Sequence, residues 1–561
     1  MVRPVAREQP RYKLDYAGGS PKPAKENWIE QSASFIGFFI YLLILKTFFL
    51  PLFIIPTGSM AQTLYGEHAL HTCPNCGTQF PVGWQPQLLD HLHRNGRWAH
   101  PGRYQPVVQC PNCRWQEYCG NPRMLHPARP QPDSMLRQPL RAVAGDRIFV
   151  HGWQFEPPLA NWDAFGPQRW DVVVFKVPTD GQTNYIKRLI GLPGEKIELI
   201  NGDVFVNDRI VPKTAEAQRS LWFPYFNTDF PPRQAAARAG YFPRWAAQDG
   251  GPWQGLGARV LRFDGLDAGP SELLFVTDPR DSNRPGLIQD IYSYNERNES
   301  TRPYEAVMDV RVSLELTVHQ IGSAGYVEIS ISRGTERFSA QLQADSRVVL
   351  RYQPDPQQPA QEWGSALLRS MRRPIRLALA HVDGTVRLEL NGQTMVETRP
   401  EQYTITPELA RHLARTRPPI ALRIGAGAVQ ATLRHVLIER DVHYTTDARL
   451  WEGERAPCFA ADGNPLQLGP DDYLVLGDNS PNSLDGRYSF SPADLPRGEW
   501  LNRAVGPHLR AAYQRGEYRV GTVRRDHLIG RAFFVYWPGF LPLTPRGPNL
   551  LPDFGRARWI R

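Results

Sequence analysis

A serine that could attack an amide bond and a lysine that could act as its base lie far apart in the sequence of this chain. Ser59 stands in IIPTGSMAQTL, directly after the apolar run FIGFFIYLLILKTFFLPLF. Pro56, Thr57 and Gly58 precede it, and their small or stiff backbones can hold a side chain on an exposed turn. A serine in a Gly-Ser dipeptide is by itself most often a turn residue. A serine nucleophile also needs a base, so its chemistry depends on a partner elsewhere.

Lys187, in NYIKRLIGLPG, is the candidate base. On a strand it shares a face with Tyr185 and Leu189. An ammonium among apolar neighbours loses hydration, so its pKa falls and the neutral amine can accept a proton. Arg188 cannot act in this way, because a guanidinium does not deprotonate in proteins. The alternative is a lysine that extends from its strand to solvent, as most do.

The segment that must position Ser59 is the apolar run of residues 35–55. As a helix it would span roughly 30 Å, enough to cross a bilayer once. Lys46 and Pro51 interrupt the run, and we expect a membrane anchor within residues 31–55. Six Lys and Arg residues precede it and none occurs from 47 to 93, which predicts a cytoplasmic N-terminus and an extracytoplasmic remainder. A cleaved signal peptide and a buried soluble helix are the alternatives, but the run starts late and lacks a small-x-small cleavage site.

The composition bounds the other possibilities. A chain of 561 residues is too long for one ordinary core, so we expect two or more domains. The net charge of +9 is spread along the chain without a dense basic block, which argues against nucleic-acid binding.

Short apolar stretches predict a β-rich protein. The expected strands of the first part are RIFV (147–150), DVVVF (171–175), NYIKRLI (184–190), and KIELI with DVFVN, which form a hairpin through Asn201-Gly202. Residues 216–300 are rich in Pro, Gly and Trp, and we expect irregular structure there. Alternation from Val310 onward, with later Asp-Gly and Asn-Gly turns, predicts a β-sandwich at about 300–446.

Six segments resemble those of bacterial type I signal peptidases, and they follow the order of that family. PTGSMAQTL resembles the nucleophile box, RWDVVVFKVP a strand box, YIKRLIGLPGEKI the lysine box, and GDNSPNSLDGR (477–487) the GDN box. AGDRIFV and HLIGRAFFVYWP resemble two further core strands. Thr57, Gln62, Ser480 and Gly486 replace the residues that are usual in these boxes.

The resemblance implies a membrane-anchored serine endopeptidase that removes N-terminal signal peptides from exported preproteins after small-x-small sites, without a catalytic cofactor. It implies that Ser59 is the nucleophile, Lys187 the general base, Thr57 a donor to the oxyanion together with the Ser59 amide, and Ser483 a partner that orients the lysine. The implied supporting residues are Asp485, Arg487, Asp478 and Arg188. The implied substrate pockets are lined by Phe53, Ile55, Met60, Leu64, Tyr185 and Ile186.

Two CxxC motifs, CPNCG at 73–77 and CPNCR at 110–114, predict a metal site. Thiolates in this spacing suit a closed, structural zinc site, although the gap between the motifs is long. Disulfides are the alternative, because the module is expected outside the membrane. The expected zinc ligands are Cys73, Cys76, Cys110 and Cys113, with His71, His91, His93 and Cys119 as substitutes. A catalytic zinc is disfavoured, since two closed motifs leave no open position.

The predicted fold is mainly β: a transmembrane helix and a signal-peptidase β-fold interrupted by a Cys-rich module and a jelly-roll-like sandwich. The predicted order is a cytoplasmic tail (1–30), the anchor (31–55), core parts at 56–70, 135–215 and 447–561, a zinc-ribbon-like insertion (71–134) and an insertion with the sandwich (216–446). The expected location is the cytoplasmic membrane, with a single pass. The sandwich weakly resembles concanavalin-like or laminin-G-like jelly rolls, which often bind glycans. Fold does not fix function, so a structural spacer or a protein-docking domain is favoured over a glycan-binding domain.

Two other functions fit parts of the sequence. A self-cleaving repressor also uses a Ser/Lys pair, but it would need a DNA-binding domain where this chain has an apolar run. A membrane-tethered lectin-like protein with an inactive peptidase core need not retain both Ser59 and Lys187, and this chain has both.

Overall fold

The structure is a computed structural model. It describes residues 28–44, 46, 49–83, 107–118, 134–135, 142–155, 166–233, 243–247, 250–277, 286–295, 304–446, 458–491, 495–542 and 549–560. Most of the predicted cytoplasmic tail, and His91, His93 and Cys119, lie outside the described residues. The chain divides into two units, Met1–Pro51 and Leu52–Arg561.

The first unit contains one apolar helix, α1 (Trp28–Ile44), of 17 residues. Most of its large apolar side chains are exposed, with Phe35 at 64% and Tyr41 at 62%. Among the residues described, no helix is both long and apolar enough to cross a membrane. The predicted span of 31–55 is also not one continuous helix, because Leu52–Ile54 form the strand β1. Pro51 explains the change, since proline lacks an amide hydrogen and disfavours helix at the preceding residue.

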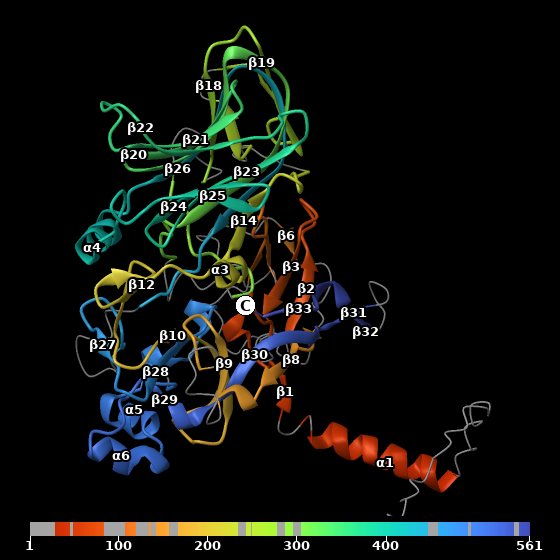
Figure 1. Cartoon of the computed structure of the whole chain (residues 1–561), viewed down its shortest axis with the longest axis vertical. Helices are drawn as coiled ribbons and strands as arrows, with labels where there is room; N and C mark the ends of the chain where they lie inside the picture. The colour runs from red at the N-terminus through yellow and green to blue at the C-terminus, as the bar shows by residue number, and fades with distance from the viewer. Residues whose placement is uncertain are drawn as a thin grey trace, which may run out of the picture. The chain divides into compact units, whose positions relative to one another are not determined.

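The core sheet of the second unit has eight strands that come from three distant parts of the chain. Figure 1 shows red, orange and blue strands side by side in its lower half. Their order is β1 (Leu52–Ile54), β8 (Arg147–His151), β30 (Leu528–Trp537), β9 (Val172–Lys176), β10 (Asn184–Gly191), β28 (Asp472–Leu476) and β29 (Val523–Arg524), with β33 (Arg558–Trp559) beside β30. The strands predicted at 147–150, 171–175 and 184–190 are thereby confirmed.

A second, smaller sheet follows the core sheet along the chain. It contains β13 (Arg209–Ile210), β12 (Asp203–Val206), β11 (Lys196–Ile200) and β27 (Leu466–Gln467) in that order. Asn201 and Gly202 have φ angles of 56° and 91° and join β11 to β12. The predicted hairpin is confirmed.

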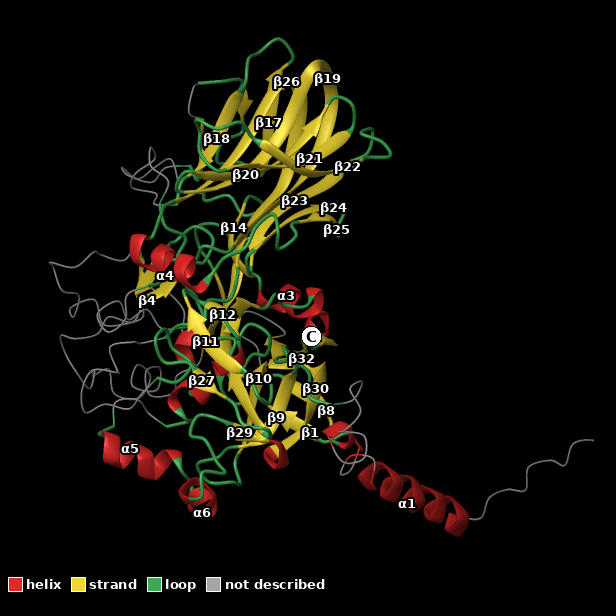
Figure 2. Cartoon of the chain, turned by 60° about the vertical axis from the view of Figure 1, so that its left-hand side comes forward, coloured by secondary structure: helices red, strands yellow, loops and turns green. Residues whose placement is uncertain are grey.

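The largest sheet has 13 strands and forms the upper body in Figures 1 and 2. Two long strands, β19 (Val310–Arg333) and β26 (Ile420–Arg440), pair along most of their length. The others after residue 300 are β20 (Glu336–Gln343), β21 (Arg347–Gln353), β22 (Gln361–Leu367), β23 (Ile375–Val382), β24 (Thr385–Leu390) and β25 (Gln393–Glu397). These strands confirm that the region predicted at about 300–446 is rich in β-structure.

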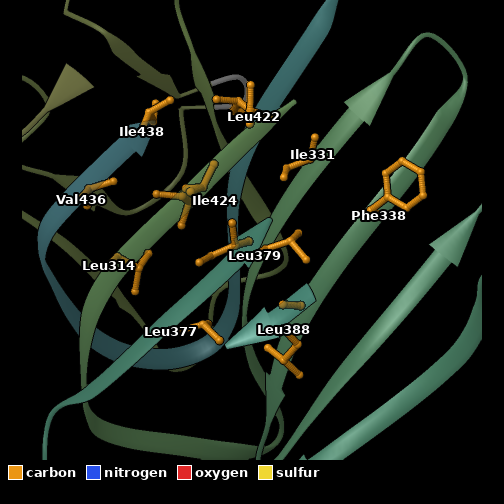
Figure 3. Close-up of a cluster of buried hydrophobic side chains, with 14 of the residues drawn as sticks. Leu314, Ile331, Phe338, Leu377, Leu379, Leu388, Leu422, Ile424, Val436 and Ile438 are labelled. Carbon is orange, nitrogen blue, oxygen red and sulfur yellow. The ribbon is translucent and has the colours of Figure 1, made fainter. Parts of the chain in front are cut away.

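Alternating apolar residues build the interior of this region. Figure 3 shows part of this cluster, with labelled side chains from β19, β20, β23, β24 and β26 that include Leu314, Phe338, Leu379 and Ile424. Each is at most 3% exposed. Burying each such side chain contributes roughly 1.5–3 kcal/mol, so this cluster is a main source of stability for the large sheet.

The prediction of irregular structure over 216–300 is wrong. This stretch contains α3 (Ala215–Leu221) and the strands β14 (Phe223–Asn227), β15 (Trp245–Ala247), β16 (Trp253–Gln254), β17 (Val260–Gly265) and β18 (Ser271–Phe275). The tryptophans form cross-strand pairs: Trp253 lies opposite Phe263 and Trp245 opposite Phe275. Such aromatic pairs stabilise strands too short to show a periodic pattern. The large sheet therefore begins well before residue 300.

The four-cysteine region consists of two small sheets. One contains β3 (Gln79–Gly83), β2 (His68–Thr72) and β7 (Ala142–Val143), and the other β4 (Val107–Gln109), β5 (Gln116–Tyr118) and β6 (Ser134–Met135). The remaining elements are α4 (Pro407–Thr416), α5 (Arg497–Ala504), α6 (Arg510–Gln514), β31 (Phe540–Pro542), β32 (Asn549–Pro552) and short 3-10 turns.

A buried cation joins the core to the large insertion. Lys213, just before α3, contacts Asp383 in the turn after β23 and Asp441 directly after β26, the latter at 2.6 Å. All three side chains are at most 3% exposed. The two chain ends of the insertion are therefore linked through one ammonium.

Replacing this ammonium should destabilise the joint. Lys213→Met leaves two buried carboxylates without their cation, and we expect a loss of about 3–5 kcal/mol in the free energy of unfolding. The control is Lys196→Met, because Lys196 and Asp208 are 35% and 57% exposed and such pairs contribute below about 1 kcal/mol. Thermal unfolding and limited proteolysis of the full chain measure both variants. Equal losses would contradict a special role of Lys213.

Candidate active site

Ser59 lies in the middle of a short 3-10 turn, η2 (Gly58–Met60), just after β1. Met60 and Leu64 are fully buried, and the Leu64 amide donates to the Met60 carbonyl at 2.8 Å. The apolar packing of these two side chains therefore holds the turn in place. Ser59 itself is 9% exposed, whereas Thr57, which precedes the turn, is exposed and makes no capping hydrogen bond.

Lys187 lies in β10, opposite Val173 of β9, and its ammonium reaches Ser59. Its Nζ donates to the Ser59 Oγ at 2.6 Å across 128 residues of sequence. The lysine is 4% exposed, so the alternative of a solvent-directed side chain is wrong. Leu189 on the same face is fully buried, and Nζ lies 5.5 Å from the centre of the Tyr185 ring.

The environment of Lys187 favours its neutral form. Burial lowers its pKa from 10.5 to about 8, while the charges of Asp485 and Asp478 oppose this shift and Arg487 adds to it. A group with this pKa is partly deprotonated near neutral pH. The amine can therefore accept the Ser59 proton without a further base.

The two nearby carboxylates are each paired with an arginine. The Arg188 Nε and Nη2 donate to the two oxygens of Asp478 at 2.8 and 2.7 Å. The Arg487 Nη2 donates to Asp485 at 2.7 Å. All four side chains are at most 1% exposed. Burial raises the pKa of Asp485, but the charge and hydrogen bond of Arg487 outweigh it and the pKa lies below its usual range.

Ser480, which stands where the resemblance predicts arginine, completes this network. Its hydroxyl accepts a hydrogen bond from Arg487 Nη1 at 2.6 Å and one from the Thr445 amide at 2.8 Å. Arg487 therefore still has hydrogen-bond partners with a serine at this position.

Ser483 lies near the site but does not contact Lys187 in the predicted way. Its buried hydroxyl makes no hydrogen bond to Lys187 among the residues described and instead faces the Asp485 carboxylate, whose pKa it helps to lower. It approaches Gly477 so closely that a Cβ there would lie 2.2 Å from the Ser483 Oγ and 2.5 Å from the Ser59 carbonyl oxygen. Only glycine lets the GDN segment come this close to the serine.

Asn479 is a site residue that the sequence analysis did not single out. Its backbone amide donates to the Ser59 carbonyl at 3.0 Å, and its side chain donates to the Gly58 carbonyl at 3.0 Å. Its position as the asparagine of the GDN box is the sequence feature that could have identified it. Asn295, which pairs with Asn479, has no such signal, because it lies in the segment for which we expected irregular structure.

Not all of the predicted pocket residues are exposed to solvent. Phe53, Ile55, Met60, Leu64 and Ile186 belong to one apolar cluster, whereas Tyr185 packs in a neighbouring one. Met60 and Leu64 have no exposed surface, so in this structure they support the site from beneath. Phe53, Tyr185 and Ile186 are half-buried and could contact a substrate.

The four predicted metal ligands lie together and are all buried. Their sulfur atoms lie within 4.8 Å of one another, with Cys73 to Cys113 and Cys76 to Cys110 at 3.6 Å. A tetrahedron with zinc–sulfur bonds of about 2.3 Å has edges of about 3.8 Å, so the arrangement fits a zinc ion. The sulfur atoms are too far apart for disulfide bonds, which need about 2 Å.

Both CxxC motifs adopt the same backbone shape. The Cys73 amide donates to Thr78 and the Cys110 amide to Trp115, and Gly77 and Arg114 both have positive φ. His71, a predicted substitute ligand, instead contacts Glu117 at 2.5 Å. Among the described residues, the candidate site therefore consists of the four cysteines.

The shifted pKa of Lys187 should be visible in stability. Between pH 8 and 10.5 the unfolded chain keeps the lysine protonated while the folded chain does not, so stability rises with pH by about 3 kcal/mol. Lys187→Met lacks this rise. Urea unfolding of both proteins from pH 7 to 10.5 tests it, and a constant difference would show that the pKa is not lowered.

Comparisons with known proteins cover the lysine and GDN boxes, whereas the nucleophile box with Ser59 lies outside the ranges that the family model matches. The family model "Signal peptidase, peptidase S26" matches residues 134–245 and 384–537. Signal peptidase I of Rickettsia typhi and that of Rickettsia prowazekii are each 52% identical to this chain over 48 residues. This stretch is 9% of this chain and 18% of each relative, so the chain spans less than a fifth of the curated relatives it matches.

Solved structures resemble the chain only distantly. A carbohydrate-binding module from Bacillus subtilis is 11% identical and covers 35% of this chain and 96% of its own, with a TM-score of 0.23. The laminarinase of Rhodothermus marinus is 10% identical and covers 40% of this chain and 98% of its own, with a TM-score of 0.26. The family match therefore rests on sequence, and it ties two separated parts of this chain to the signal peptidases of family S26.

Proposed function

We propose that this protein is a membrane-anchored serine endopeptidase that removes N-terminal signal peptides from exported preproteins. The observation that carries the proposal is the buried contact of 2.6 Å between Lys187 Nζ and Ser59 Oγ. The match of residues 134–245 and 384–537 to the S26 family model supports the same reaction class.

The reaction proceeds in two steps through an ester on Ser59. Neutral Lys187 takes the Ser59 proton as the oxygen attacks the scissile carbonyl, and it then gives the proton to the leaving amine. The Ser59 amide and the Thr57 hydroxyl donate to the oxyanion. Water, deprotonated by the same lysine, then hydrolyses the ester, releases the signal peptide and restores Ser59.

Substrate choice and location follow from the apolar surroundings. The half-buried Phe53, Tyr185 and Ile186 line shallow pockets that accept small side chains before the cut. The exposed apolar side chains of α1 belong to a single anchor in the cytoplasmic membrane, with the N-terminus inside and the catalytic unit outside. A signal peptide held in the same bilayer presents its cleavage site at the membrane surface.

Variants of the pair test the mechanism. With a preprotein that carries an Ala-x-Ala site, Ser59→Ala and Lys187→Ala should each lower kcat by about 10³-fold or more. Lys187→Arg should be equally inactive, because it keeps the charge but cannot deprotonate. In the wild type the rate should rise with pH to a plateau above about pH 8. Cleavage by Ser59→Ala at the wild-type rate would contradict the proposal. Lys196→Ala is the control for the loss of a lysine side chain.

We also propose that Cys73, Cys76, Cys110 and Cys113 hold a structural zinc ion. Four thiolates would complete its coordination, so the metal stabilises the module and takes no part in catalysis.

Metal analysis of the purified full-length protein should find about one zinc per chain. The count should fall in Cys73→Ser and Cys110→Ser, while Cys458→Ser is the matched control because Cys458 lies outside the cluster. Two disulfides would instead give no zinc, no free thiols in the module, and a shift in electrophoretic mobility on reduction.

A further inference from the structure

A short segment of the large insertion lies directly against the nucleophile turn. This clamp segment, residues 292–295, belongs neither to the motifs that carry the Ser/Lys pair nor to the ranges matched by the family model. Tyr294 and Ser293 are buried and Asn295 is half-buried. A turn hydrogen bond from the Asn295 amide to the Tyr292 carbonyl, 3.1 Å long, gives the segment its shape.

Asn295 forms a reciprocal amide pair with Asn479. The Asn295 Nδ2 donates to the Asn479 Oδ1 at 2.6 Å, and the Asn479 Nδ2 donates to the Asn295 Oδ1 at 2.7 Å. The same Asn479 Nδ2 donates to the Gly58 carbonyl, and the Asn479 amide donates to the Ser59 carbonyl. The orientation of the Asn479 side chain, and with it the hydrogen bond to the Gly58 carbonyl, therefore depends on Asn295.

Tyr294 covers the other side of the same turn. A Cβ at Gly58 would lie 2.0 Å from the Tyr294 Cε1, so the ring packs directly on the glycine before Ser59. The Tyr294 hydroxyl donates to the Glu67 carbonyl at 3.1 Å, and the Gly83 amide donates to the Tyr294 carbonyl at 2.9 Å. The clamp segment thus connects the turn to the hairpin that carries the first CxxC motif.

The clamp segment is itself held by the large sheet. Arg440, the last residue of β26, is 4% exposed, and its Nη2 donates to the carbonyls of Asp290 and Ile291 at 3.2 and 3.3 Å. The Asp290 amide donates to the Glu305 carbonyl, and the Glu305 amide donates back to Asp290 Oδ1. The ring of Tyr292 packs edge-on against Phe223 of β14.

We propose that Asn295 is a positioning residue for Ser59, which acts through Asn479, and that the clamp segment fixes the nucleophile turn relative to Lys187. This inference rests on the proposed peptidase function. The insertion is then a working part of the active site, because it supplies a contact that the core alone lacks. Without the amide pair, the Asn479 side chain can rotate and the Ser59 turn loses one of its two restraints.

The test compares Asn295→Ala with Asn295→Asp, which keeps the acceptor but not the donor, and with Gln402→Ala. Gln402 also donates from a side-chain amide within the insertion, to the Trp363 carbonyl at 3.4 Å, and it is the matched control. In full-length protein, Asn295→Ala should lower kcat by about 10- to 100-fold with little change in KM, because misplacement of a nucleophile slows the chemical step. The decrease in kcat should be smaller for Asn295→Asp, and Gln402→Ala should keep the wild-type kcat.

A double-mutant cycle separates positioning from general destabilisation. If Asn295 acts through Asn479, the loss in kcat for Asn295→Ala with Asn479→Ala should equal the loss for Asn479→Ala alone. Multiplied losses, or an unchanged kcat in Asn295→Ala, would overturn the inference.

Amide hydrogen exchange gives a readout that does not require activity. Peptides covering residues 57–64 and 477–485 should exchange faster in Asn295→Ala and unchanged in Gln402→Ala, because the Asn479 amide is held by Ser59. Unchanged amide exchange in Asn295→Ala would also overturn the inference that the clamp segment fixes the turn. If the wild type does not cut the preprotein, the peptidase proposal fails and exchange still decides the role of Asn295.

Discussion

The structure depends on keeping one lysine amine out of water beside a serine hydroxyl. Burial disfavours the ammonium form of Lys187, but two carboxylates lie close enough to favour it. Both are already engaged, Asp478 by Arg188 and Asp485 by Arg487, in fully desolvated pairs. Each pair presents little net charge to the lysine, so desolvation wins and the pKa falls to about 8. The two buried ion pairs therefore leave desolvation as the dominant influence on the Lys187 pKa.

This arrangement explains why distant parts of the chain must meet. Ser59 comes from the turn after β1, Lys187 from β10, and both carboxylates from the segment after β28. The insertions leave the core between these strands and do not interrupt them. Lys213 contacts Asp441, so the start and the end of a stretch of more than 200 residues are held close together at the core.

Much of the core was predictable, because its signals are local. Lys187 and Ser59 lie in motifs, β9 is an apolar run, and the hairpin at Asn201-Gly202 needs only turn residues with positive φ. The failures are of a different kind. β15 and β16 contain three and two residues, too few to show a period, and their stability comes from tryptophans opposite phenylalanines in other strands. Asn295 could not be found, because nothing in its own sequence indicates its pairing with Asn479.

The position of Asn295 also bears on how an enzyme core accommodates an insertion. A spacer needs only to leave the active site unobstructed, and it would have no reason to bury an asparagine against the nucleophile turn. Here the contact runs from β26 through Arg440 to the carbonyls of Asp290 and Ile291, and from there to Asn479 and Gly58. The path from β26 to the serine turn consists of hydrogen bonds at its two ends and of the backbone of residues 290–295 between them. Hydrogen bonds to buried or half-buried groups are costly to leave unmade, so this segment is firmly attached on both sides.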